Sequence, residues 1–240
     1  MAAASGMRSR LESLDMLANN LANASAPGFK TDREFYSLYV SADAADGNEG
    51  QSPVTAPLVE KQWTDFSQGI LTPTSNPLDL AITGKGFFAV TSPTGTLFTR
   101  DGSFKLSPQG ELQTQEGYAV RDPDGKPIVV DSNKPTDIGL DGTLRQDGVD
   151  VAKINLVDFK DPQSLSKQGQ SYFFADNGNA PIAAAQAEVQ QGKLEGANFQ
   201  TAESAVRMIT VMRQFESLQK AMTVGTDMNK KAVEEVARVE

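Results

Sequence analysis

Both ends of the chain carry hydrophobic residues at the spacing of amphipathic helices. Near the N-terminus the apolar and small positions alternate steps of four and three residues, which is the period of a coiled-coil seam. These positions are Met7, Leu11, Leu14, Ala18, Leu21 and Ser25, and Leu17 widens the stripe. Pro27 and Gly28 predict that this helix ends near Ala24 or Ser25. A short helix with so narrow a stripe is marginally stable in water, so we expect it to need a partner.

The C-terminal segment is predicted to be one long helix from Thr201 to about Arg238, because no proline follows Gly192. Its apolar positions again follow steps of three and four, and they are Met208, Val211, Phe215, Leu218, Met222, Ala232, Val236 and Val239. On this pattern alone, the two ends form either an ordinary helix pair that closes a core or a surface for other chains. The C-terminal stripe is longer than the N-terminal one, so its surplus would need a partner outside the chain.

Between the two ends, short runs of alternating polar and apolar residues predict β-strands. These runs lie at 78–90, 96–120, 151–159 and 170–176. Turn signals such as Asp101–Gly102 separate them. Many short strands with regular turns are typical of a sandwich or an irregular barrel. Residues 43–57 are polar and rich in turn-forming residues, and we expect a flexible loop there.

Composition removes most kinds of catalytic chemistry. The 240 residues contain neither cysteine nor histidine, which excludes disulfides, thiol nucleophiles, structural zinc sites and histidine acid–base catalysis. No run of about 18 apolar residues is present, so we expect no insertion into a membrane. The first 30 residues lack the layout of a cleavable secretory signal, so export would require another route.

Charge separates the ends of the chain from its centre. The net charge is -9, and residues 31–190 carry 12 basic and 22 acidic side chains, whereas both ends are close to neutral. An acidic centre repels phosphate groups, so nucleic acid is not expected as a partner. The near-neutral ends are better candidates for burial in a protein–protein contact.

Two local motifs suggest ligand sites, and turn chemistry explains both of them better. Gly84–Lys85–Gly86 lacks the spacing of a phosphate-binding loop, so a tight turn or a bulge is expected. Residues 122–127 resemble the start of a calcium loop, but Gly125 comes too early. We therefore expect no cofactor and no metal ion.

Carboxylate pairs are the remaining candidates for catalysis. Asp101 with Glu111, or Asp79 with Asp122, would provide the two carboxyl groups that glycosidases use. A β domain with this many acidic residues produces such pairs by chance, and no pair stands out. A solvated acidic surface is the simpler interpretation.

Six segments together resemble the bacterial flagellar basal-body rod and hook family. They are AASGM at 3–7, LANNLANASAPGFK at 17–30, NPLDLAITGKGFF at 76–88, FTRDGSF at 98–104, GELQTQEGY at 110–118 and LEGANFQTAESAVRMI at 194–209. Each segment is weak evidence alone, but all six occur in family order. The resemblance implies terminal helices that pack with neighbouring subunits into a helical tube, with a β domain outside it. It also implies passage through the flagellar type III export apparatus without a cleavable signal peptide.

The resemblance further implies a structural subunit of the periplasm-spanning rod that transmits torque and is not an enzyme. Its partners would be further copies of itself and other rod and hook subunits. RQFE at 213–216 and the length of 240 residues are more similar to proximal than to distal rod proteins, and the distal position is the alternative. Hook proteins are usually much longer. Members of the family usually have several more residues before AASGM than this chain has.

Pattern and resemblance together predict an α+β fold. A mainly antiparallel β domain is expected to be inserted into a discontinuous coiled-coil domain made by the N- and C-terminal helices. The expected parts are an N-terminal helix at 1–30, an extended linker at 31–75, the β domain at 76–191 and the C-terminal helix at 192–240.

The predicted functional site is a subunit-packing seam. Its residues are Leu11, Leu14, Leu17, Leu21, Val206, Ile209, Phe215, Leu218 and Met222. The periodicity predicts that the leucine stripe meets the long helix, but it leaves open whether that helix belongs to the same copy or to a neighbour. Two alternatives come from other functional classes. One is a carboxylate-based hydrolase of cell-wall polysaccharide, and the other is a monomeric adhesin whose β domain sits on a helical stalk.

Overall fold

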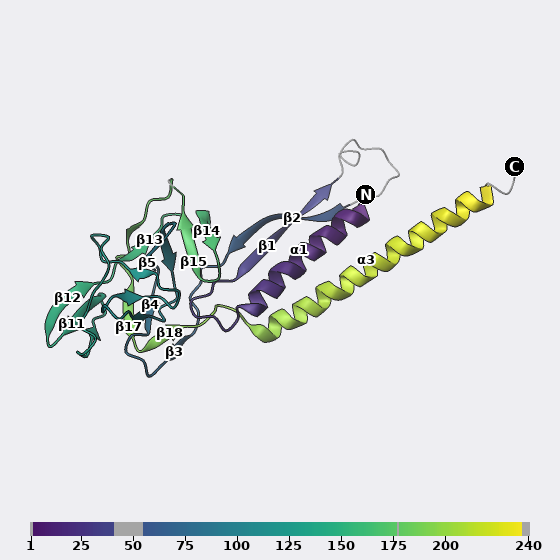
Figure 1. Ribbon diagram of the computed structural model, residues 1–240. Coiled ribbons are helices and arrows are strands. Elements are labelled where there is room, and N and C mark those ends of the chain that lie inside the picture. Colours follow the sequence, from purple (N-terminus) through teal and green to yellow (C-terminus); the bar gives the residue numbers. More distant parts are fainter. Residues whose placement is uncertain (1, 41–54, 177, 237–240) are drawn as a thin grey trace. The chain divides into compact units, whose positions relative to one another are not determined.

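The computed structural model describes residues 2–40, 55–176 and 178–236 (Figure 1). The chain divides into two compact units. Met1–Ala22, Asp32–Trp63 and Gln200–Glu240 form the first, which we call the terminal unit. Asn23–Thr31 and Thr64–Phe199 form the second, which we call the β unit. The fold is α+β, as predicted, and each unit is assembled from segments that are far apart in the sequence.

The terminal unit contains two antiparallel helices and a two-stranded sheet. Helix α1 (Ala2–Ala22) packs against helix α3 (Thr201–Val236), and strand β1 (Asp32–Val40) pairs with strand β2 (Thr55–Thr64) (Figure 1). The contacts give the relative direction of the helices. Gly6 of α1 lies against Leu218, whereas Leu17, near the other end of α1, packs with Val211.

The helix boundaries are close to those expected from capping and breaking signals. Helix α1 ends at Ala22, slightly before the expected end, because the chain turns at Asn23, whose carbonyl accepts a hydrogen bond from the Ala26 amide at 3.0 Å. Helix α3 begins at Thr201, as expected. The expected end at Arg238, and most of the loop expected at 43–57, lie outside the described residues.

The β unit is built from short antiparallel strands. They are β3 (Leu71–Pro73), β4 (Leu80–Thr83), β5 (Phe87–Ser92), β6 (Gly95–Thr99), β7 (Lys105–Leu106), β8 (Leu112–Gln113), β9 (Ala119–Val120), β10 (Asp137–Ile138), β11 (Thr143–Gln146), β12 (Val149–Lys153), β13 (Leu156–Asp158), β14 (Leu165–Gln168), β15 (Tyr172–Ala175), β16 (Ile182–Ala183), β17 (Glu188–Gln191) and β18 (Lys193–Glu195). A single 3-10 turn, η1 (Pro162–Ser164), precedes β14.

The largest sheet runs in the order β14-β15-β6-β5-β9-β8-β7, and β13 joins it by pairing with β5 and β16. A three-stranded sheet runs in the order β10-β11-β12, and the pairs β17-β4 and β18-β3 complete the unit. In these last two pairs, residues 188–195 lie beside residues 71–83. The chain segment that leads into α3 is therefore part of the β unit.

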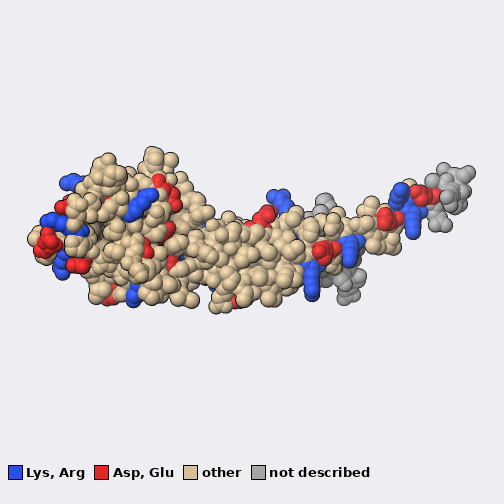
Figure 2. Space-filling view, turned by 60° about the horizontal axis from the view of Figure 1, so that its bottom comes forward, with Lys and Arg blue, Asp and Glu red and all other residues tan. Residues whose placement is uncertain are grey.

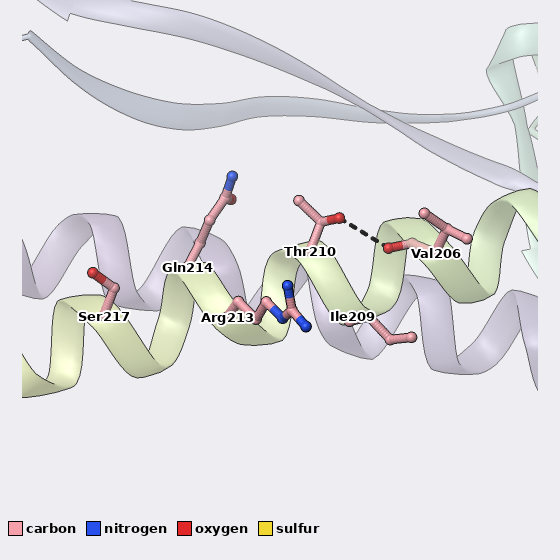
Figure 3. A pocket seen from close by; sticks show the side chains of 6 residues that line it. All are labelled: Val206, Ile209, Thr210, Arg213, Gln214 and Ser217. Atoms are coloured by element: carbon pink, nitrogen blue, oxygen red, sulfur yellow. Dashed lines mark hydrogen bonds between the residues drawn. The ribbon is translucent and has the colours of Figure 1, made fainter.

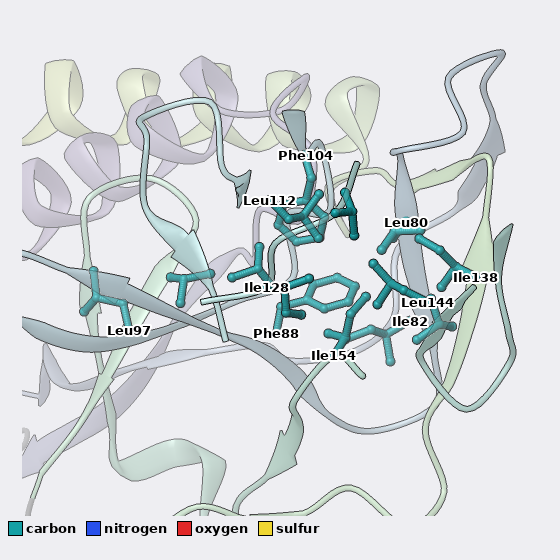
Figure 4. Close-up of a cluster of buried hydrophobic side chains, with 14 of the residues drawn as sticks. Leu80, Ile82, Phe88, Leu97, Phe104, Leu112, Ile128, Ile138, Leu144 and Ile154 are labelled. Atoms are coloured by element: carbon teal, nitrogen blue, oxygen red, sulfur yellow. The ribbon is translucent and has the colours of Figure 1, made fainter. Parts of the chain in front are cut away.

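Both faces of the largest sheet are buried, which explains the unbroken apolar run in β5. Phe88 and Val90 point into the main core, which also contains Leu80, Phe104 and Leu144 (Figure 4). The alternate residues Phe87 and Ala89 belong to a second cluster on the other face. That second cluster is aromatic, because Phe66, Phe87, Phe98, Phe159 and Phe173 contact one another edge to face. Edge-to-face pairs add to the stabilisation that burial alone provides.

Two of the expected segment boundaries differ from the structure. Residues 31–75, expected to be an extended linker, include the paired strands β1 and β2 and the strand β3. Residues 193–195, expected to open the C-terminal helical part, form β18 instead. Both differences arise from backbone pairing between distant segments, such as Leu194 with Thr72, which local periodicity does not reveal. The turns expected at 84–86 and at 122–127 are present.

The buried Tyr172 donates a hydrogen bond to the Glu116 carboxylate. Burial and this bond raise the pKa of Tyr172 well above its ordinary value. Burial alone would raise the pKa of Glu116, but the hydrogen bonds from Tyr172, from its own backbone amide and from Thr114, together with the attraction of Lys105, lower that pKa overall. A carboxylate with a lowered pKa stabilises the folded state at neutral pH and loses this contribution as the pH falls through its folded-state pKa. A phenol with a raised pKa stabilises the folded state below its ordinary pKa of about 10 and loses this contribution above it.

We therefore expect the Tyr172→Phe variant to lose about 1 kcal/mol of unfolding free energy at neutral pH, because Glu116 is largely exposed and solvent weakens the bond. The loss should shrink in acid, where Glu116 is protonated. Urea unfolding of the full chain at neutral and acidic pH measures both values. Tyr118→Phe is the control, since the Tyr118 ring contacts the Tyr172 ring without a hydrogen bond from its hydroxyl among the described residues. An equal loss at both pH values would contradict this account.

Candidate functional site

The seam between α1 and α3 is formed by part of the predicted set of residues. Leu17 and Met16 are buried against Val211, and Leu14 and Met208 pack at the edge of this cluster. Phe215 and Leu218 continue the same face of α3 and are half-buried. The steps of three and four on α3 therefore identified the face that meets α1 within one copy.

In an ordinary helix pair the leucine stripe of α1 would be buried against α3, but here most of it is exposed. Leu11 is 47% exposed and Leu21 is 39% exposed. Ala18 of the same stripe is exposed as well, and Leu14 is only half-buried. Of the four predicted leucines, Leu17 alone is buried inside the chain. Most of the stripe is therefore available to another molecule.

The buried face of α1 is not the leucine stripe but a face of small and polar residues. Ser9, Ser13 and Asn20 are buried together with Gly6. The Ser13 hydroxyl lies 2.9 Å from the Ser9 carbonyl and 2.7 Å from the Glu34 carboxylate, and it donates to these acceptors. Small residues allow α1 to approach β1 and α3 closely, and the hydrogen bonds satisfy the polar groups of Ser13 and Asn20. The buried Ser9 hydroxyl has no hydrogen-bond partner among the described residues.

Two further polar contacts fix α1 and α3 to strand β1. The Asn20 side chain bonds to both backbone groups of Asp32, donating to the carbonyl at 2.8 Å and accepting from the amide at 3.0 Å. Arg207 of α3 donates to the Glu34 carboxylate at 3.0 Å. These contacts orient each helix about its own axis, so the outward position of the leucine stripe is determined by hydrogen bonds.

The outer face of α3 carries a shallow groove. Its lining residues are Val206, Ile209, Thr210, Arg213, Gln214 and Ser217 (Figure 3). All six come from α3, and the Thr210 hydroxyl is directed to the Val206 carbonyl, to which it donates at 2.9 Å. Val206 is 65% exposed and Ile209 is 53% exposed. These two members of the predicted seam therefore lie away from α1 of their own copy.

The second half of α3 has no cover from the described part of the chain. Every side chain from Gln219 to Glu234 is exposed, including those of Met222, Val224 and Met228. Of the surplus apolar stripe expected from the sequence, Met222 and Ala232 are exposed, and Val239 lies outside the described residues. On the face of the terminal unit drawn in Figure 2, charged side chains form small, separated groups with uncharged surface between them.

A second feature of the structure, in the β unit, was missed by the analysis of the sequence. Lys30, Arg100 and Glu195 form a fully buried ion cluster, which we call the Glu195 cluster. The Lys30 ammonium lies 2.6 Å from one carboxylate oxygen of Glu195, and the Arg100 guanidinium lies 3.1 Å from the other. The Gly69 amide also donates to Glu195 at 2.8 Å. The cluster thereby joins four segments that are distant in the sequence.

Lys30 and the two terminal nitrogens of Arg100 also bind backbone carbonyls, whereas the Arg100 Nε is buried without a hydrogen-bond partner among the described residues. Lys30 donates to Ser67 at 2.7 Å, and Arg100 donates to Gly84 at 2.6 Å. Burial lowers the pKa of Lys30 and of Arg100, and the attraction of each to Glu195 opposes that shift. One carboxylate thus compensates two buried cations, so the cluster depends strongly on Glu195.

The backbone at Gly28 passes very close to the backbone of Asp101, next to the Glu195 cluster. Its φ is +66°, and a Cβ atom there would lie 2.2 Å from the Asp101 amide nitrogen. Its amide donates to the Glu195 carbonyl at 2.7 Å. Only glycine allows the two backbones to approach this closely. The motifs APGFK, TRDG and LEGAN, which contain Gly28, Asp101 and Glu195, therefore meet in one contact. The sequence signal that could have indicated the Glu195 cluster is a single charged residue inside each of these apolar, turn-rich motifs.

The carboxylates considered for catalysis are held by local structure. Asp101 accepts hydrogen bonds from both the hydroxyl and the amide of Ser103, and burial raises its pKa. Asp79 accepts from Asn76, and Asp122 accepts from the Lys126 amide. These bonds are those of turns. Within the described residues, no group of three or more acidic side chains could hold a metal ion, and neither helix is long and apolar enough to cross a bilayer.

Comparison with known proteins gives consistent results along the chain. Residues 2–30 match the family model "Flagella basal body rod protein". Residues 81–146 match "Flagellar hook protein FlgE/F/G D1 domain", and residues 190–235 match "Flagellar basal body rod FlgEFG protein C-terminal". The three matches include both helices of the terminal unit and much of the β unit.

Whole-length relatives lead to the same family. The chain is 34% identical to the flagellar basal-body rod protein FlgF of Caulobacter vibrioides, over 94% of this chain and 92% of the relative. It is 32% identical to FlgF of Mesorhizobium japonicum, over 92% and 90%. It is 29% identical to the rod protein FlgG of Borreliella burgdorferi, over 94% of each chain. The chain therefore belongs to the flagellar basal-body rod and hook protein family, whose members are structural proteins and not enzymes.

Proposed function

We propose that this protein is a structural subunit of the proximal rod, which polymerises through its terminal unit and transmits torque along the flagellar axis. Family membership supports the rod assignment. The observation that carries the mode of assembly is the exposure of apolar stripes on both α1 and α3 while these helices already pack against each other.

Each helix has one face committed to its own copy and another face free for a neighbour. This arrangement suits a coiled-coil tube in which every helix contacts more than one other helix. Exposed apolar residues that continue along one face of a helix mark an interaction surface. The subunit-packing role of the predicted seam, from Leu11 to Met222, is part of this proposal.

The proposal also assigns the subunit to the proximal part of the rod and not to the distal part. The sequence RQFE at 213–216 and the chain length resemble proximal rod proteins, and the two FlgF relatives are more similar in sequence than the FlgG relative described above. Export would use the flagellar type III apparatus without a cleavable signal, and assembly would take place in the periplasm. The partners would be further copies and other rod and hook subunits.

Deleting the gene in its own bacterium tests the proposal. We expect swimming to be lost and to return when the intact gene is supplied on a plasmid. Basal bodies isolated from the complemented strain should contain the protein, and immunogold labelling should place it at the end of the rod nearest the inner membrane. Electron microscopy of the label and swimming in soft agar provide the two measurements.

Other outcomes, one of them from a separate enzyme assay, would support an alternative or contradict the proposal. Label at the hook end of the rod would support a distal subunit. Normal swimming in the deletion strain would contradict any rod function. A release of soluble fragments from peptidoglycan by the purified protein would support the hydrolase.

A further inference from the structure

The outward face of α1 combines apolar and small residues around one acidic side chain. Leu11, Ala18 and Ala22 are exposed on this face, and Asp15 lies among them. Residues spaced by three, four and seven positions share one face of a helix. Asp15 has no ion-pair partner among the residues that the structure describes.

The groove of α3 has the matching features. Arg213 lies in its middle, between the apolar pair Val206 and Ile209 on one side and Ser217 on the other (Figure 3). In the described part of the chain, Arg213 also lacks an ion-pair partner. Arg213 is the only charged residue that lines the groove, and Asp15 is the charge at the centre of the α1 face, so the two charges at the middle of these surfaces are of opposite sign.

We infer that the outer face of α1 of one copy docks in the α3 groove of the next copy, with Asp15 facing Arg213. This inference rests on the proposed function, and it names the partner of the exposed faces as a second copy of this chain. The two faces differ from each other, so the contact is heterologous. A heterologous contact repeated from copy to copy produces a ring or a helical filament, which is the geometry of an axial tube.

The direction of the docked helices follows from the fold. Successive copies in a filament have the same orientation along its axis, so α1 is antiparallel to the neighbour's α3 just as it is to its own. With Asp15 beside Arg213, antiparallel alignment places Ala18 beside Thr210 and Ile209, and it places Ala22 beside Val206. Small residues on one helix thus meet the larger ones on the other. Leu11 then lies beside Ser217, at the far end of the groove.

A contact between four residues of α1 and the six residues that line the α3 groove is too small to hold an isolated pair of copies together. In a filament every copy makes it twice, once through α1 and once through α3. The charge pair would contribute mainly to register and specificity, because complementary charges across a contact select the partner more than they strengthen binding. The apolar residues would provide most of the binding.

Cysteine cross-linking tests the contact directly, because the chain has no cysteine of its own. Two differently tagged variants, Ala22→Cys and Val206→Cys, are expressed together in the deletion strain, and basal bodies are isolated. We expect a disulfide-linked dimer that carries both tags, and the pair Ala18→Cys with Thr210→Cys should give the same product. Ala22→Cys with Ala205→Cys is the control, since Ala205 is exposed on another side of α3.

Charge exchange provides the second test. Asp15→Arg and Arg213→Asp should each reduce swimming to the level of the deletion strain, and the double variant should recover most of it. Asp124→Arg, in an exposed turn of the β unit, makes the same change of charge and should swim normally.

The outcomes separate this inference from the proposed function. If both tagged variants enter the basal body without forming the mixed dimer, the inferred contact is wrong and the rod function stands. Dimers only between identical variants, or cross-links only to other rod proteins, would also overturn it. A failure of the double charge variant to improve on the single variants would exclude the Asp15–Arg213 register.

Discussion

Replacing Glu195 by glutamine should lower the free energy of unfolding of the β unit by about 3 to 5 kcal/mol. The Glu195 carboxylate is fully buried and compensates both Lys30 and Arg100. Glutamine has the same shape, so the packing would be kept while two buried cations lost their counter-charge. Urea unfolding of the full chain, followed by hydrogen exchange of the backbone amides in strands β4 to β18, measures the change, because these strands belong to the β unit and both helices belong to the terminal unit.

Two further variants provide a scale for the loss of unfolding free energy expected for Glu195→Gln. Asp150→Asn breaks an exposed ion pair with Arg145, whose atoms are 2.6 Å apart, and solvent screening should make its effect on the free energy of unfolding small. Lys30→Met removes one of the two cations and leaves Glu195 paired with Arg100, so its cost should lie between those of the other two variants. If Glu195→Gln were no more harmful than Asp150→Asn, the cluster would not have the stabilising role that its burial indicates.

The Glu195 cluster also shows where reasoning from the sequence alone reaches its limit. The motifs that carry Lys30, Arg100 and Glu195 were recognised as family features, but nothing local indicates that their charged residues meet. Residues 30 and 195 are at opposite ends of the chain. Their contact depends on the pairing of β18 with β3 and on the close passage at Gly28, and neither has a periodic signal.

The helices were predictable because their signals are local. The periodicity from Met208 to Leu218 identified the face of α3 that packs against α1, and Pro27 with Gly28 located the end of the first helix within a few residues. The strands were predictable from turn residues and alternation, but their order in the sheets was not. The runs of β5 and β13 both stood out, for example, yet nothing in either shows that they are neighbours.

The sequence placed the candidate site on α1 and α3, but the orientation of α1 was not predictable from it. Leucine at positions 11, 14 and 21 of α1 suggests a buried face, because burial of apolar surface usually determines how a helix is oriented. Here hydrogen bonds made by Ser13 and Asn20 orient the helix the other way. An isolated chain would lose stability by exposing leucine, and the exposure is understandable if another copy covers it. The outward leucines are therefore the strongest link between this fold and assembly.

This interpretation predicts that Leu11→Asp and Leu14→Asp affect different properties. Leu11 is exposed, so an aspartate there should change the free energy of unfolding by less than about 0.5 kcal/mol, apart from a few tenths from repulsion by Asp15 at i+4. Leu14 packs at the edge of the cluster that joins α1 to α3, so an aspartate there should cost about 1 to 3 kcal/mol. Urea unfolding of the purified full-length variants distinguishes the two.

Swimming, in contrast, should be lost in both variants. Leu14→Asp would separate α1 from its own α3, whereas Leu11→Asp would leave the monomer intact and place a charge in the contact with the next copy. Leu140→Asp is the matched control, because Leu140 is 58% exposed but belongs to the β unit, and that variant should both fold and swim normally. A Leu11→Asp strain that swims like the parent would show that the exposed stripe of α1 is not covered in the rod. Loss of swimming together with normal unfolding of Leu11→Asp would identify the stripe as a surface used only in assembly.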